Sequence, residues 1–502
     1  MELSGKRVLV MGLGVHGGGL GVARWLLRQG AQVTVTDVAS PEALAAPVAA
    51  LDAAAAARGV SVAYTLDAHR VEDFTSAEMV VVNPAVRPDS PWLAHAVAAG
   101  VPVETEMTLF FRVCPGPIFG VTGTKGKTTT ALLLAAMLRE RYPDTVAAGN
   151  LRVSALEALD TITAQTPVVL ELSSFQLERL GAVGLSPRYS LITNLSSDHL
   201  NWHGSMENYA AAKGQIYRHQ APDGVVALNG ADDGSAEYCT LWDAGRPLGG
   251  RQIWVGAGPH WSRVRSRYPQ PVVRAVDTRV ELHHDTVFWC DARGVFGPAT
   301  PPQGEPLFVR GDLRLPGAHN LYNAMLAAAL ARAFGVEAEA LRAGVRGFAG
   351  VEHRLEPVRE LEAVYYVNDT TATNPAATLA ALAAIETPLI LIAGGADKQL
   401  DFRSLGAAIA RRVKALVLLD GSATPRLLDA IAAGGVPPSE TALVTISGPF
   451  SDFAQAIAAA RALAGSGDTV LLSPGCASFG MFRNEFERGE QFRRLVGELD
   501  QR

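Results

Sequence analysis

The segment GVTGTKGKTTT at 120–130 brings glycines, lysines and threonines together directly after an apolar stretch. Gly123 and Gly126 allow the backbone to curl, so that several N–H groups point into one concavity. Lys127 supplies a cation for outer phosphates, and the Thr128 hydroxyl is placed to bind Mg²⁺. The loop departs by one residue from the GxxxxGK[ST] pattern, which leaves a glycine-rich surface turn as the alternative. Because a strand pattern precedes it and a helix pattern follows, we predict an ATP-binding loop.

A second glycine-rich loop, Gly12-Leu13-Gly14-Val15-His16-Gly17, follows the strand pattern RVLVMG near the N-terminus. Asp37 ends the next strand pattern, at the spacing of a dinucleotide-binding fingerprint. Taken alone the fingerprint indicates NAD, but the same geometry binds any diphosphate at a helix N-terminus. The residues therefore leave NAD, another nucleoside diphosphate, or a turn without a ligand open.

Three stretches in which strand and helix patterns alternate position these loops. They span residues 1–112, 113–350 and 351–502, and 502 residues are too many for one hydrophobic core. We predict an α/β protein of three domains: a Rossmann-like N-terminal domain, a P-loop ATPase-like central domain and a Rossmann-like C-terminal domain. Residues 245–310 are rich in Gly, Pro and Arg, and we expect them to form an antiparallel extension of the central domain.

Composition excludes several classes of protein. The net charge of −6 does not favour a surface for nucleic acid. Four cysteines are scattered without a CxxC pair, which favours a reducing compartment over a disulfide framework. No apolar run reaches the roughly 18 residues of a membrane span. We therefore expect a cytoplasmic protein without a membrane span, acting as a monomer.

The loop Gly123-Thr124-Lys125-Gly126-Lys127-Thr128-Thr129 resembles the ATP loop of the Mur ligase family, GTxGKTT. The resemblance covers nearly the whole chain and is strongest to the members that add glutamate. The other segments that carry it are ELSSFQLE at 171–178, TNLSSDHLNWHGSMENYAAAK at 193–213, GAHNLYNA at 317–324, EHRLE at 352–356, NDTTATNPAATLAAL at 368–382, GGADKQLDF at 394–402 and SPGCASFGMFRNEFERG at 473–489.

The resemblance implies an ATP-dependent amide ligase. Enzymes of this family use ATP to convert a substrate carboxylate into an acyl phosphate, which the amine of an amino acid then attacks. For this chain the resemblance implies UDP-N-acetylmuramoyl-L-alanine, glutamate (D-glutamate first) and ATP as substrates, Mg²⁺ as cofactor, and a role in peptidoglycan precursor synthesis. Such a site needs cations and metal, because two anionic substrates must meet there.

The resemblance also assigns the catalytic and metal-binding residues. Lys127 matches the residue that holds the transferring phosphoryl group, and Thr128 the residue that contacts Mg²⁺. Glu171 and His199 match further Mg²⁺ ligands. Lys213 matches a lysine that is carbamylated in this family, and a carbamate turns a cation into an anion able to support Mg²⁺. Taken singly, Glu171 could equally be a surface acid, His199 a helix cap and Lys213 a solvated lysine.

Further residues are implied in binding the two nucleotides. Asp37 matches the residue facing uracil, and Asn150 a contact to the muramoyl group, although Leu151-Arg152 replaces the usual IG after it. The implied UDP-substrate residues are Gly14, Val15, His16, Asp37, Asn83 and Asn150. The implied ATP residues beyond the loop are Asn320 and Asn323, near adenine, and Arg354 and Asp369, which close over the nucleotide.

The amino-acid pocket is where the chain departs from the family. The implied glutamate-binding residues are Thr373, Lys398, Ser478 and Phe486. Thr371 stands where the family has a lysine, and an extra residue precedes Phe486, so that Glu485 takes its place if no insertion is allowed. These departures leave the identity and stereochemistry of the added amino acid open.

Three other functions remain as alternatives. The same chemistry could serve L-glutamate or another amino acid. An NAD-dependent oxidoreductase with an accessory ATPase would explain the first loop but leaves the Gly-Lys-Thr loop unexplained, and the sequence offers no proton donor to pair with it. A nucleotide-sensing protein without catalysis would not need Lys127, Glu171, His199 and Lys213 together, and all four are present.

Overall fold

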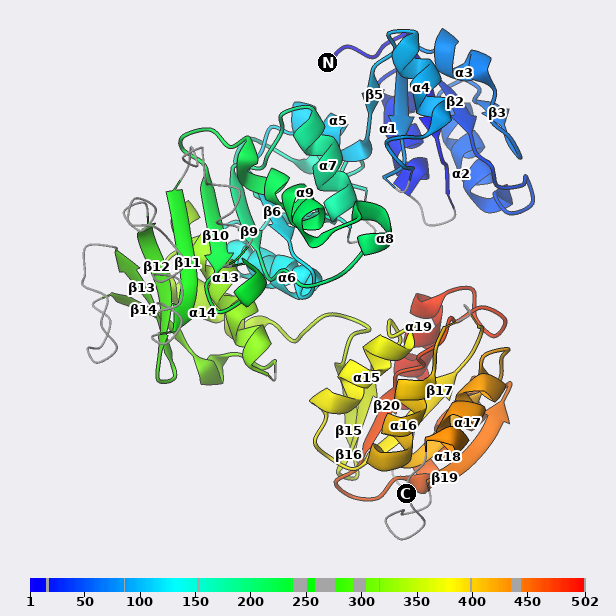
Figure 1. Cartoon of the computed structure of the whole chain (residues 1–502), viewed down its shortest axis with the longest axis vertical. Helices are drawn as coiled ribbons and strands as arrows, with labels where there is room; N and C mark the ends of the chain where they lie inside the picture. Colours follow the sequence, from blue (N-terminus) through cyan, green and yellow to red (C-terminus); the bar gives the residue numbers. More distant parts are fainter. Residues whose placement is uncertain are drawn as a thin grey trace. The chain divides into compact units, whose positions relative to one another are not determined.

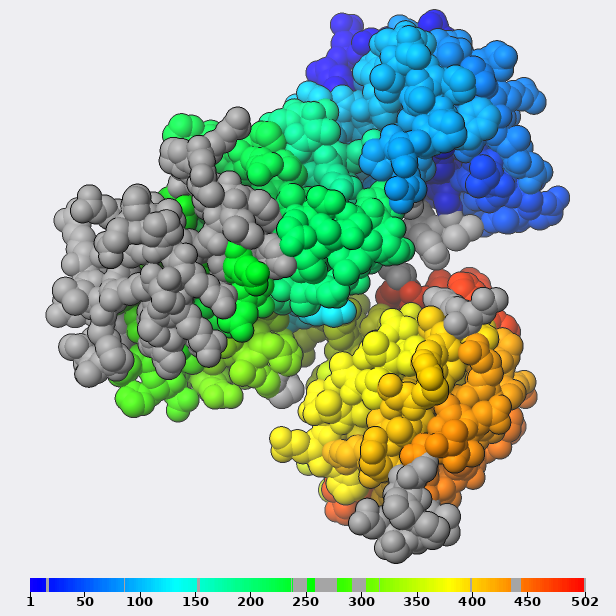
Figure 2. Space-filling view, in the orientation of Figure 1, coloured from blue at the N-terminus to red at the C-terminus, as the bar shows by residue number. Residues whose placement is uncertain are grey.

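The chain forms two compact units, Met1–Phe348 and Ala349–Arg502, in a computed structural model (Figure 1). The structure describes residues 1–14, 18–84, 86–150, 154–235, 237, 251–257, 276–291, 304–315, 317–397, 400–434 and 444–500. No helix in these ranges is long and apolar enough to cross a membrane. In Figure 2 the first unit is coloured from blue to green and the second from yellow to red.

The first sheet of the first unit is parallel, in the order β3-β2-β1-β4-β5. Its strands are β1 (Arg7–Met11), β2 (Gln32–Thr36), β3 (Ala63–Thr65), β4 (Met79–Val82) and β5 (Val103–Glu104). Its helices are α1 (Gly18–Arg28), α2 (Ala45–Ala56), α3 (Val71–Ser76) and α4 (Pro91–Ala98), and α5 (Glu106–Val113) leads into the second sheet. The central strands read as unbroken apolar runs because helices cover both faces of the sheet.

The second sheet of this unit has the order β14-β13-β12-β11-β10-β9-β6-β8-β7. Its strands are β6 (Ile118–Thr122), β7 (Val146–Gly149), β8 (Val168–Glu171), β9 (Tyr189–Ile192), β10 (Val225–Asn229), β11 (Arg251–Ala257), β12 (Val276–His283), β13 (Thr286–Asp291) and β14 (Glu305–Val309). Its α-helices are α6 (Lys127–Arg139), α7 (Ser174–Ala182), α8 (Leu200–His203), α9 (Met206–Arg218), α13 (Ala318–Phe334) and α14 (Ala338–Gly347).

The topology of this sheet places β6 between β8 and β9, and all three strands run parallel. The crossover through α6 runs toward β7, and the crossover through α7 runs the other way, toward β9. Right-handed crossovers in opposite directions put their helices on opposite faces. Accordingly α6 packs with α13 and α14, whereas α7 packs with α9 (Figure 1). The carboxyl ends of the three strands meet at one edge, where ligands bind in open α/β sheets.

The far end of the second sheet is antiparallel, since β13 runs opposite to both β12 and β14. These strands come from the region 245–310, so the antiparallel extension expected there is present in its described part.

The second unit contains a six-stranded sheet in the order β15-β16-β20-β17-β18-β19, parallel except for the β15–β16 hairpin. Its strands are β15 (Glu356–Leu361), β16 (Val364–Asn368), β17 (Leu389–Gly394), β18 (Val413–Leu419), β19 (Thr445–Phe450) and β20 (Thr469–Leu472). Its helices are α15 (Pro375–Ala384), α16 (Arg403–Arg412), α17 (Thr424–Ala433), α18 (Phe453–Leu463) and α19 (Glu485–Gly497). Two apolar clusters, one on each face of the sheet, form its core.

The predicted α/β class with three sheet-containing parts is confirmed. The three sheets lie inside the ranges 1–112, 113–350 and 351–502, and the domain boundaries themselves stay a prediction.

Candidate active site

The predicted phosphate loop connects the buried strand β6 to α6, which begins at Lys127. Gly126 caps α6 in the left-handed conformation, with φ of +79°. Gly123 has φ of +147°, and a Cβ atom there would lie 1.9 Å from Thr193 Oγ1. Both positions therefore require glycine. The first N–H groups of α6 have no partner within the helix, which suits them to an anion.

The segment after β9 holds this loop in shape. Thr193 Oγ1 donates a hydrogen bond of 2.5 Å to the Lys125 carbonyl oxygen. The Asn194 side chain donates to the same oxygen and accepts from the Lys125 N–H, both at 2.9 Å. The Thr124 hydroxyl accepts from the Ser196 N–H at 3.0 Å. These bonds fix the loop against the segment after β9, and the N–H groups of Thr124 and Lys125 both donate to Asn194.

Glu171 ends β8, and its side chain is buried at the edge beside the loop. Thr128 Oγ1 donates to Glu171 Oε2 at 2.7 Å, and Asn150 Nδ2 donates to Oε1 at 3.1 Å. A residue predicted for ATP and Mg²⁺ and a residue predicted for the UDP-linked substrate therefore meet on one carboxylate. Lys127 Nζ lies over its own loop and donates to the Thr124 carbonyl oxygen at 3.0 Å.

Lys213 projects from α9 and is only 2% exposed. Its Nζ lies 3.4 Å from Thr122 Oγ1 and 4.8 Å from the centre of the Tyr209 ring. Burial and the Lys127 ammonium group lower the pKa of the Lys213 amine well below its ordinary range, and the charges of Asp198 and Glu171 oppose this shift only in part. Because the pKa is lowered, the neutral, nucleophilic amine is more populated than on an exposed lysine.

His199 precedes α8 in the left-handed conformation, with φ of +52°. Its Nε2 lies 3.8 Å from Asp198 Oδ2, and its ring packs edge-on against Phe175 at 5.2 Å between centroids. His199 makes no hydrogen bond to Glu171 or Thr128. Of the predicted metal ligands, Thr128 and Glu171 contact each other directly, whereas His199 contacts neither of them.

The donor set still fits a magnesium ion. A hydroxyl and a carboxylate are oxygen ligands of the kind Mg²⁺ prefers, and the ion normally shares its coordination with phosphates and water. Among the described residues, no three His, Cys, Asp or Glu side chains cluster closely enough to hold a metal. Thr128 and Glu171 alone would not complete the coordination of a magnesium ion, so the substrate phosphates and water would have to supply further ligands.

Asn323 connects α13 to the phosphate loop. It is buried, and its amide would lie within 3 Å of a Cβ atom at Gly126. Its Nδ2 donates to Asn320 Oδ1 at 3.3 Å. The two residues predicted near adenine therefore lie together beside the loop.

The N-terminal glycine loop is partly described. The Gly14 N–H donates to Asp37 Oδ2 at 3.2 Å, and Asp37 Oδ1 accepts from the Ala39 N–H at 2.9 Å. Asn83 follows β4 and packs against Gly12, where its Cβ would be 3.1 Å from an added Cβ atom. Asp37 and Asn83 thus lie at the carboxyl edge of the first sheet with Gly14. The other two predicted residues of this site, Val15 and His16, lie outside the described residues.

The remaining predicted residues belong to the second unit, and Asp369 among them directly follows β16. Asp369 Oδ1 accepts from the Leu355 N–H at 3.1 Å, and Oδ2 accepts from Ser473 Oγ at 2.7 Å. Burial raises the pKa of Asp369 to about 6, although these bonds and the charge of Arg354 favour its ionised form. Arg354 itself is exposed.

Ser478 and Phe486 belong to the segment between β20 and the first turn of α19. Ser478 is buried, and no residue that the structure describes forms a hydrogen bond with its Oγ. Phe486 packs edge-on against His353, with 5.6 Å between ring centroids. Thr373, half-buried, follows β16 in the turn before α15. Lys398 lies outside the described residues.

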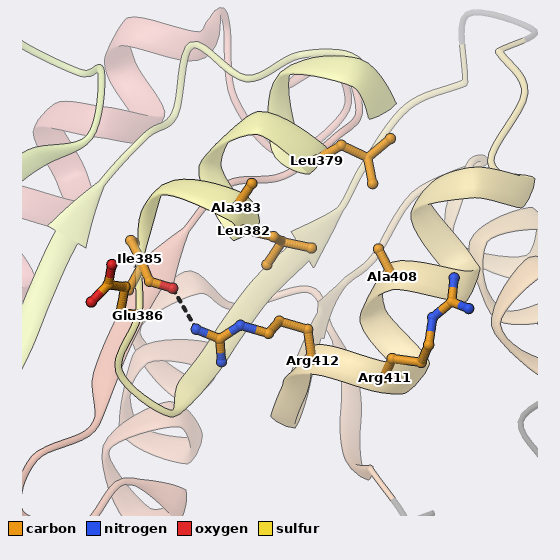
Figure 3. Close-up of a pocket in the computed structure, with 8 residues that line it drawn as sticks. All are labelled: Leu379, Leu382, Ala383, Ile385, Glu386, Ala408, Arg411 and Arg412. Carbon is orange, nitrogen blue, oxygen red and sulfur yellow. Dashed lines mark hydrogen bonds between the residues drawn. The ribbon is translucent and has the colours of Figure 1, made fainter. Parts of the chain in front are cut away.

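A groove of about 590 Å³ lies elsewhere, between α15 and α16 of the second unit (Figure 3). It is lined by Leu379, Leu382, Ala383, Ile385, Glu386, Ala408, Arg411 and Arg412. The lining comes mostly from the carboxyl-terminal halves of the two helices, and none of these residues belongs to the predicted site. The groove is therefore separate from the predicted site residues.

The sequence matches family profiles in each of the three sheet-containing parts. Residues 6–105 match the profile described as "Mur ligase MurD-like, N-terminal domain", residues 121–247 "Mur ligase middle domain", and residues 353–476 "Mur ligase, glutamate ligase domain". A protein of Roseiflexus sp. (strain RS-1), named UDP-N-acetylmuramoylalanine–D-glutamate ligase, is 54% identical over 99% of both chains. The chain belongs to the Mur ligase family.

Other relatives of this Mur ligase agree with that assignment. A protein of the same name from Symbiobacterium thermophilum is 34% identical over 98% of both chains. Among solved structures, UDP-N-acetylmuramate-alanine ligase MurC from Thermotoga maritima superposes with a TM-score of 0.57 at 18% identity, over 98% of this chain and 99% of that one. The second comparison supports the fold, and the first supports the family. This Mur ligase is thus an enzyme of the ATP-dependent ligase class.

Several residues of the site were missed in the sequence. Thr193, Ser196 and Tyr209 hold the phosphate loop, the last through its hydroxyl at 3.3 Å from Thr124 Oγ1. His353 and Arg488 organise the second unit's site. All five lie inside or beside segments that resemble the family, but threonine, serine and tyrosine carry no spacing that distinguishes a loop-supporting residue from an ordinary strand-end residue.

Proposed function

We propose that this Mur ligase joins D-glutamate to UDP-N-acetylmuramoyl-L-alanine at the expense of ATP, in peptidoglycan precursor synthesis. The two relatives described above carry this activity in their names. The observation that carries the proposal is the contact of Thr128 and Asn150 with the two oxygens of Glu171. It links the phosphate loop to the residue predicted to contact the muramoyl group, so that the γ-phosphate and the substrate carboxylate can meet.

In the proposed reaction the substrate carboxylate attacks the γ-phosphorus of ATP, giving an acyl phosphate and ADP. The amine of glutamate then attacks the acyl carbon, its nitrogen gives up one proton to water, an amide forms, and phosphate leaves with the electron pair of the broken C–O bond. Lys127 and the N–H groups of the loop and α6 hold the phosphates and offset their charge. Lys127 must turn away from the Thr124 carbonyl oxygen, with which it bonds in this structure, to reach a phosphate.

Mg²⁺ would neutralise phosphate charge and help align the reacting groups when bound. Thr128, Glu171 and His199 are the side chains that would hold it, together with Lys213 as a carbamate. The donor chemistry supports this assignment, because Thr128 and Glu171 already present oxygens to each other at 2.7 Å.

Carbamylation of Lys213 is supported by its environment. The reaction requires a neutral amine, and burial favours that form. The neutral nitrogen attacks CO₂, a C–N bond forms, and the released proton goes to water. The product is an anion close to Glu171 and Lys127. The charges of Lys127 and of a bound Mg²⁺ would balance it.

The second unit would bind glutamate, and it also carries two residues assigned to the nucleotide. Arg354 and Asp369 are assigned to the nucleotide, and Thr373, Lys398, Ser478 and Phe486 to glutamate. The unpartnered hydroxyl of the buried Ser478 supports a polar ligand at this edge.

Phosphate release with UDP-N-acetylmuramoyl-L-alanine, Mg²⁺ and each glutamate enantiomer tests the proposal. We expect ADP and one new amide bond with D-glutamate, and no product from Lys127→Ala. Product with L-glutamate instead would favour the alternative substrate, which Thr371 and the extra residue Glu485 keep in view. Absence of any amide product from the wild-type protein would refute the proposal.

The oxidoreductase alternative makes a different prediction. It requires NAD at the loop that includes Gly14, whereas we propose UDP there, with Asp37 near uracil. Titration of the protein with UDP and with NAD separates the two. We also place the reaction in the cytoplasm, which the free Cys114, Cys290 and Cys476 support, and expect a monomer by sedimentation.

A further inference from the structure

Arg488 is an unusual residue in the second unit, because it projects from α19 and its side chain is fully buried. Its Nε donates to Thr370 Oγ1 and its Nη2 donates to the Thr370 carbonyl oxygen, both at 2.9 Å. This two-point contact ties α19 to the turn that follows β16. Thr370 Oγ1 in turn donates to the Glu485 carbonyl oxygen at 2.8 Å.

Arg488 forms no ion pair with any described residue, and the nearest acid whose charge acts on it is Glu485. No carboxylate among the described residues lies within 4 Å of the guanidinium group, and Nη1 is buried without a hydrogen-bond partner there. Burial lowers the pKa of Arg488 to about 10, so the group remains charged at neutral pH. A buried cation that forms no ion pair destabilises the folded protein, and a ligand with negative charge would offset this cost.

A second unsatisfied polar group lies beside it. Ser478 is 3% exposed, and its Oγ has no hydrogen-bond partner among the described residues. Phe482 connects the two residues, since its ring lies 5.9 Å below the Arg488 guanidinium carbon and its N–H donates to the Ser478 carbonyl oxygen at 3.2 Å. Ser478 and Thr370 follow β20 and β16, which are neighbouring parallel strands, so both lie at the carboxyl edge of the sheet.

Position 371 does not supply a cation to this edge. Thr371 stands there, and its hydroxyl donates to the His353 carbonyl oxygen at 2.9 Å. Among the described residues, Arg488 is the cation that donates hydrogen bonds to Thr370 in the turn after β16, and the charge of Arg354 acts on Asp369 of the same turn.

We propose that Arg488 is a positioning residue that makes the amino-acid pocket select an acidic side chain. Its charge favours a carboxylate over a neutral amide, and its bonds to Thr370 hold the turn that carries Thr373 against the segment that carries Ser478. The inference rests on the proposed function, and it adds a residue and a source of selectivity to the glutamate site.

The test compares glutamate with glutamine, which has nearly the same shape without the charge. Arg488→Met keeps much of the volume and removes the charge. We expect its preference for D-glutamate over D-glutamine, measured as the ratio of kcat/KM values, to fall roughly tenfold or more, with the KM for ATP nearly unchanged. Arg488→Lys keeps the charge but loses the fork, so the preference should largely persist while the KM for D-glutamate rises.

Arg412→Met is the matched control. Arg412 also donates to main-chain carbonyl oxygens, those of Ile385 and Thr387, but it lies beside the groove in Figure 3 rather than at the site. Its loss should lower the melting temperature without changing the preference for glutamate. If Arg488→Met does not fold, Thr370→Val serves in its place, because it removes one acceptor of the guanidinium at similar volume. It should raise the KM for D-glutamate and leave that for ATP.

The outcomes are distinguishable from failure of the proposed function. A wild-type enzyme that forms no amide refutes the function itself. A wild-type enzyme that forms the amide, with an unchanged glutamate-to-glutamine ratio in Arg488→Met, overturns the role of Arg488. An equal loss of preference in Arg412→Met, or unchanged kinetics in Thr370→Val, would also overturn it.

Discussion

Lys213 and Asp369 are buried ionisable residues that the proposed chemistry uses, one in each unit. Burial is the largest influence on both, and it favours the neutral form in each case: it lowers the pKa of the Lys213 amine and raises that of the Asp369 carboxyl group to about 6. Neutral Lys213 suits a carbamate-forming amine. The fold thus places Lys213 and Asp369 where a charge is unfavourable in the free protein. A bound ligand or a modification would stabilise the charge there.

Lys213→Ala should abolish amide formation, because the proposed carbamate would be lost. Short carboxylates such as acetate should restore part of the activity, since they can occupy the space of the side chain and supply an anion. Phosphate release measured with and without acetate checks this. Lys127→Ala is the control, since it lacks a cation and acetate should not rescue it. Full activity of Lys213→Ala would contradict the assignment.

Asp369→Asn should alter how stability depends on pH. The folded-state pKa of about 6 lies above the ordinary 3.8, so ionising Asp369 costs more in the folded protein than in the unfolded chain. Relative to the variant, the wild type should be most stable below about pH 4 and should lose roughly 2–3 kcal/mol as the pH rises through about 6. Denaturant unfolding at several pH values measures this difference. A difference that does not change with pH would show that Asp369 has no raised pKa.

The turn between β6 and α6 shows how elements create the site. The strand order places β8 and β9 on either side of β6, so Glu171 and Thr193 reach the loop from opposite sides. The same arrangement leaves almost no space at Gly123. The loop is therefore a product of three parallel strand ends rather than of its own sequence alone.

Gly123→Ala should strongly reduce ATP-dependent turnover. The new methyl group would meet Thr193 Oγ1 at 1.9 Å, in a backbone conformation that L residues rarely adopt. Gly184→Ala is a matched control, because Gly184 also has positive φ, +70°, but nothing lies within 4 Å of its added Cβ. It should cost about 1–2 kcal/mol of stability and leave turnover unchanged. Equal effects of the two substitutions on turnover would argue against a specific role for the loop.

At the scale of the whole molecule, the chain divides into two units with separate cores. The proposed reaction needs both, since the phosphate loop belongs to the first and the proposed glutamate residues to the second. A destabilising substitution in one unit should therefore lower the stability of that unit alone. The same substitution should lower the activity of the whole enzyme.

Leu416→Ala, in the buried strand β18, should destabilise the second unit by about 2–5 kcal/mol through a cavity. Hydrogen exchange should accelerate in β17 and β18 and stay unchanged in β6 and β8. Leu330→Ala, in α13 of the first unit, should give the reverse pattern. Acceleration across both units from either substitution would mean that they unfold as one.

The sequence determined the chemistry of the protein because its reactive residues stand in short segments of fixed spacing. The Gly-Lys-Thr loop, the alternating α/β pattern and the family segments predicted the α/β class and the ligase family, and both are confirmed. Such motifs can be recognised in a sequence because a phosphate loop is built from consecutive residues. The individual site residues stay predictions, which the contacts of Glu171, Thr128 and Asn150 support.

The tertiary structure decided what depends on distant parts of the chain meeting. Glu171 and Asn150, 21 positions apart, share a hydrogen bond, and Arg488 reaches Thr370 from 118 positions away. The burial of Lys213 and of Arg488 is likewise invisible in a sequence pattern, and so is the lack of a hydrogen-bond partner for the Ser478 hydroxyl among the described residues. The physical reason is that desolvation depends on everything packed around a group, and packing is a property of the folded sheet edges rather than of neighbouring residues.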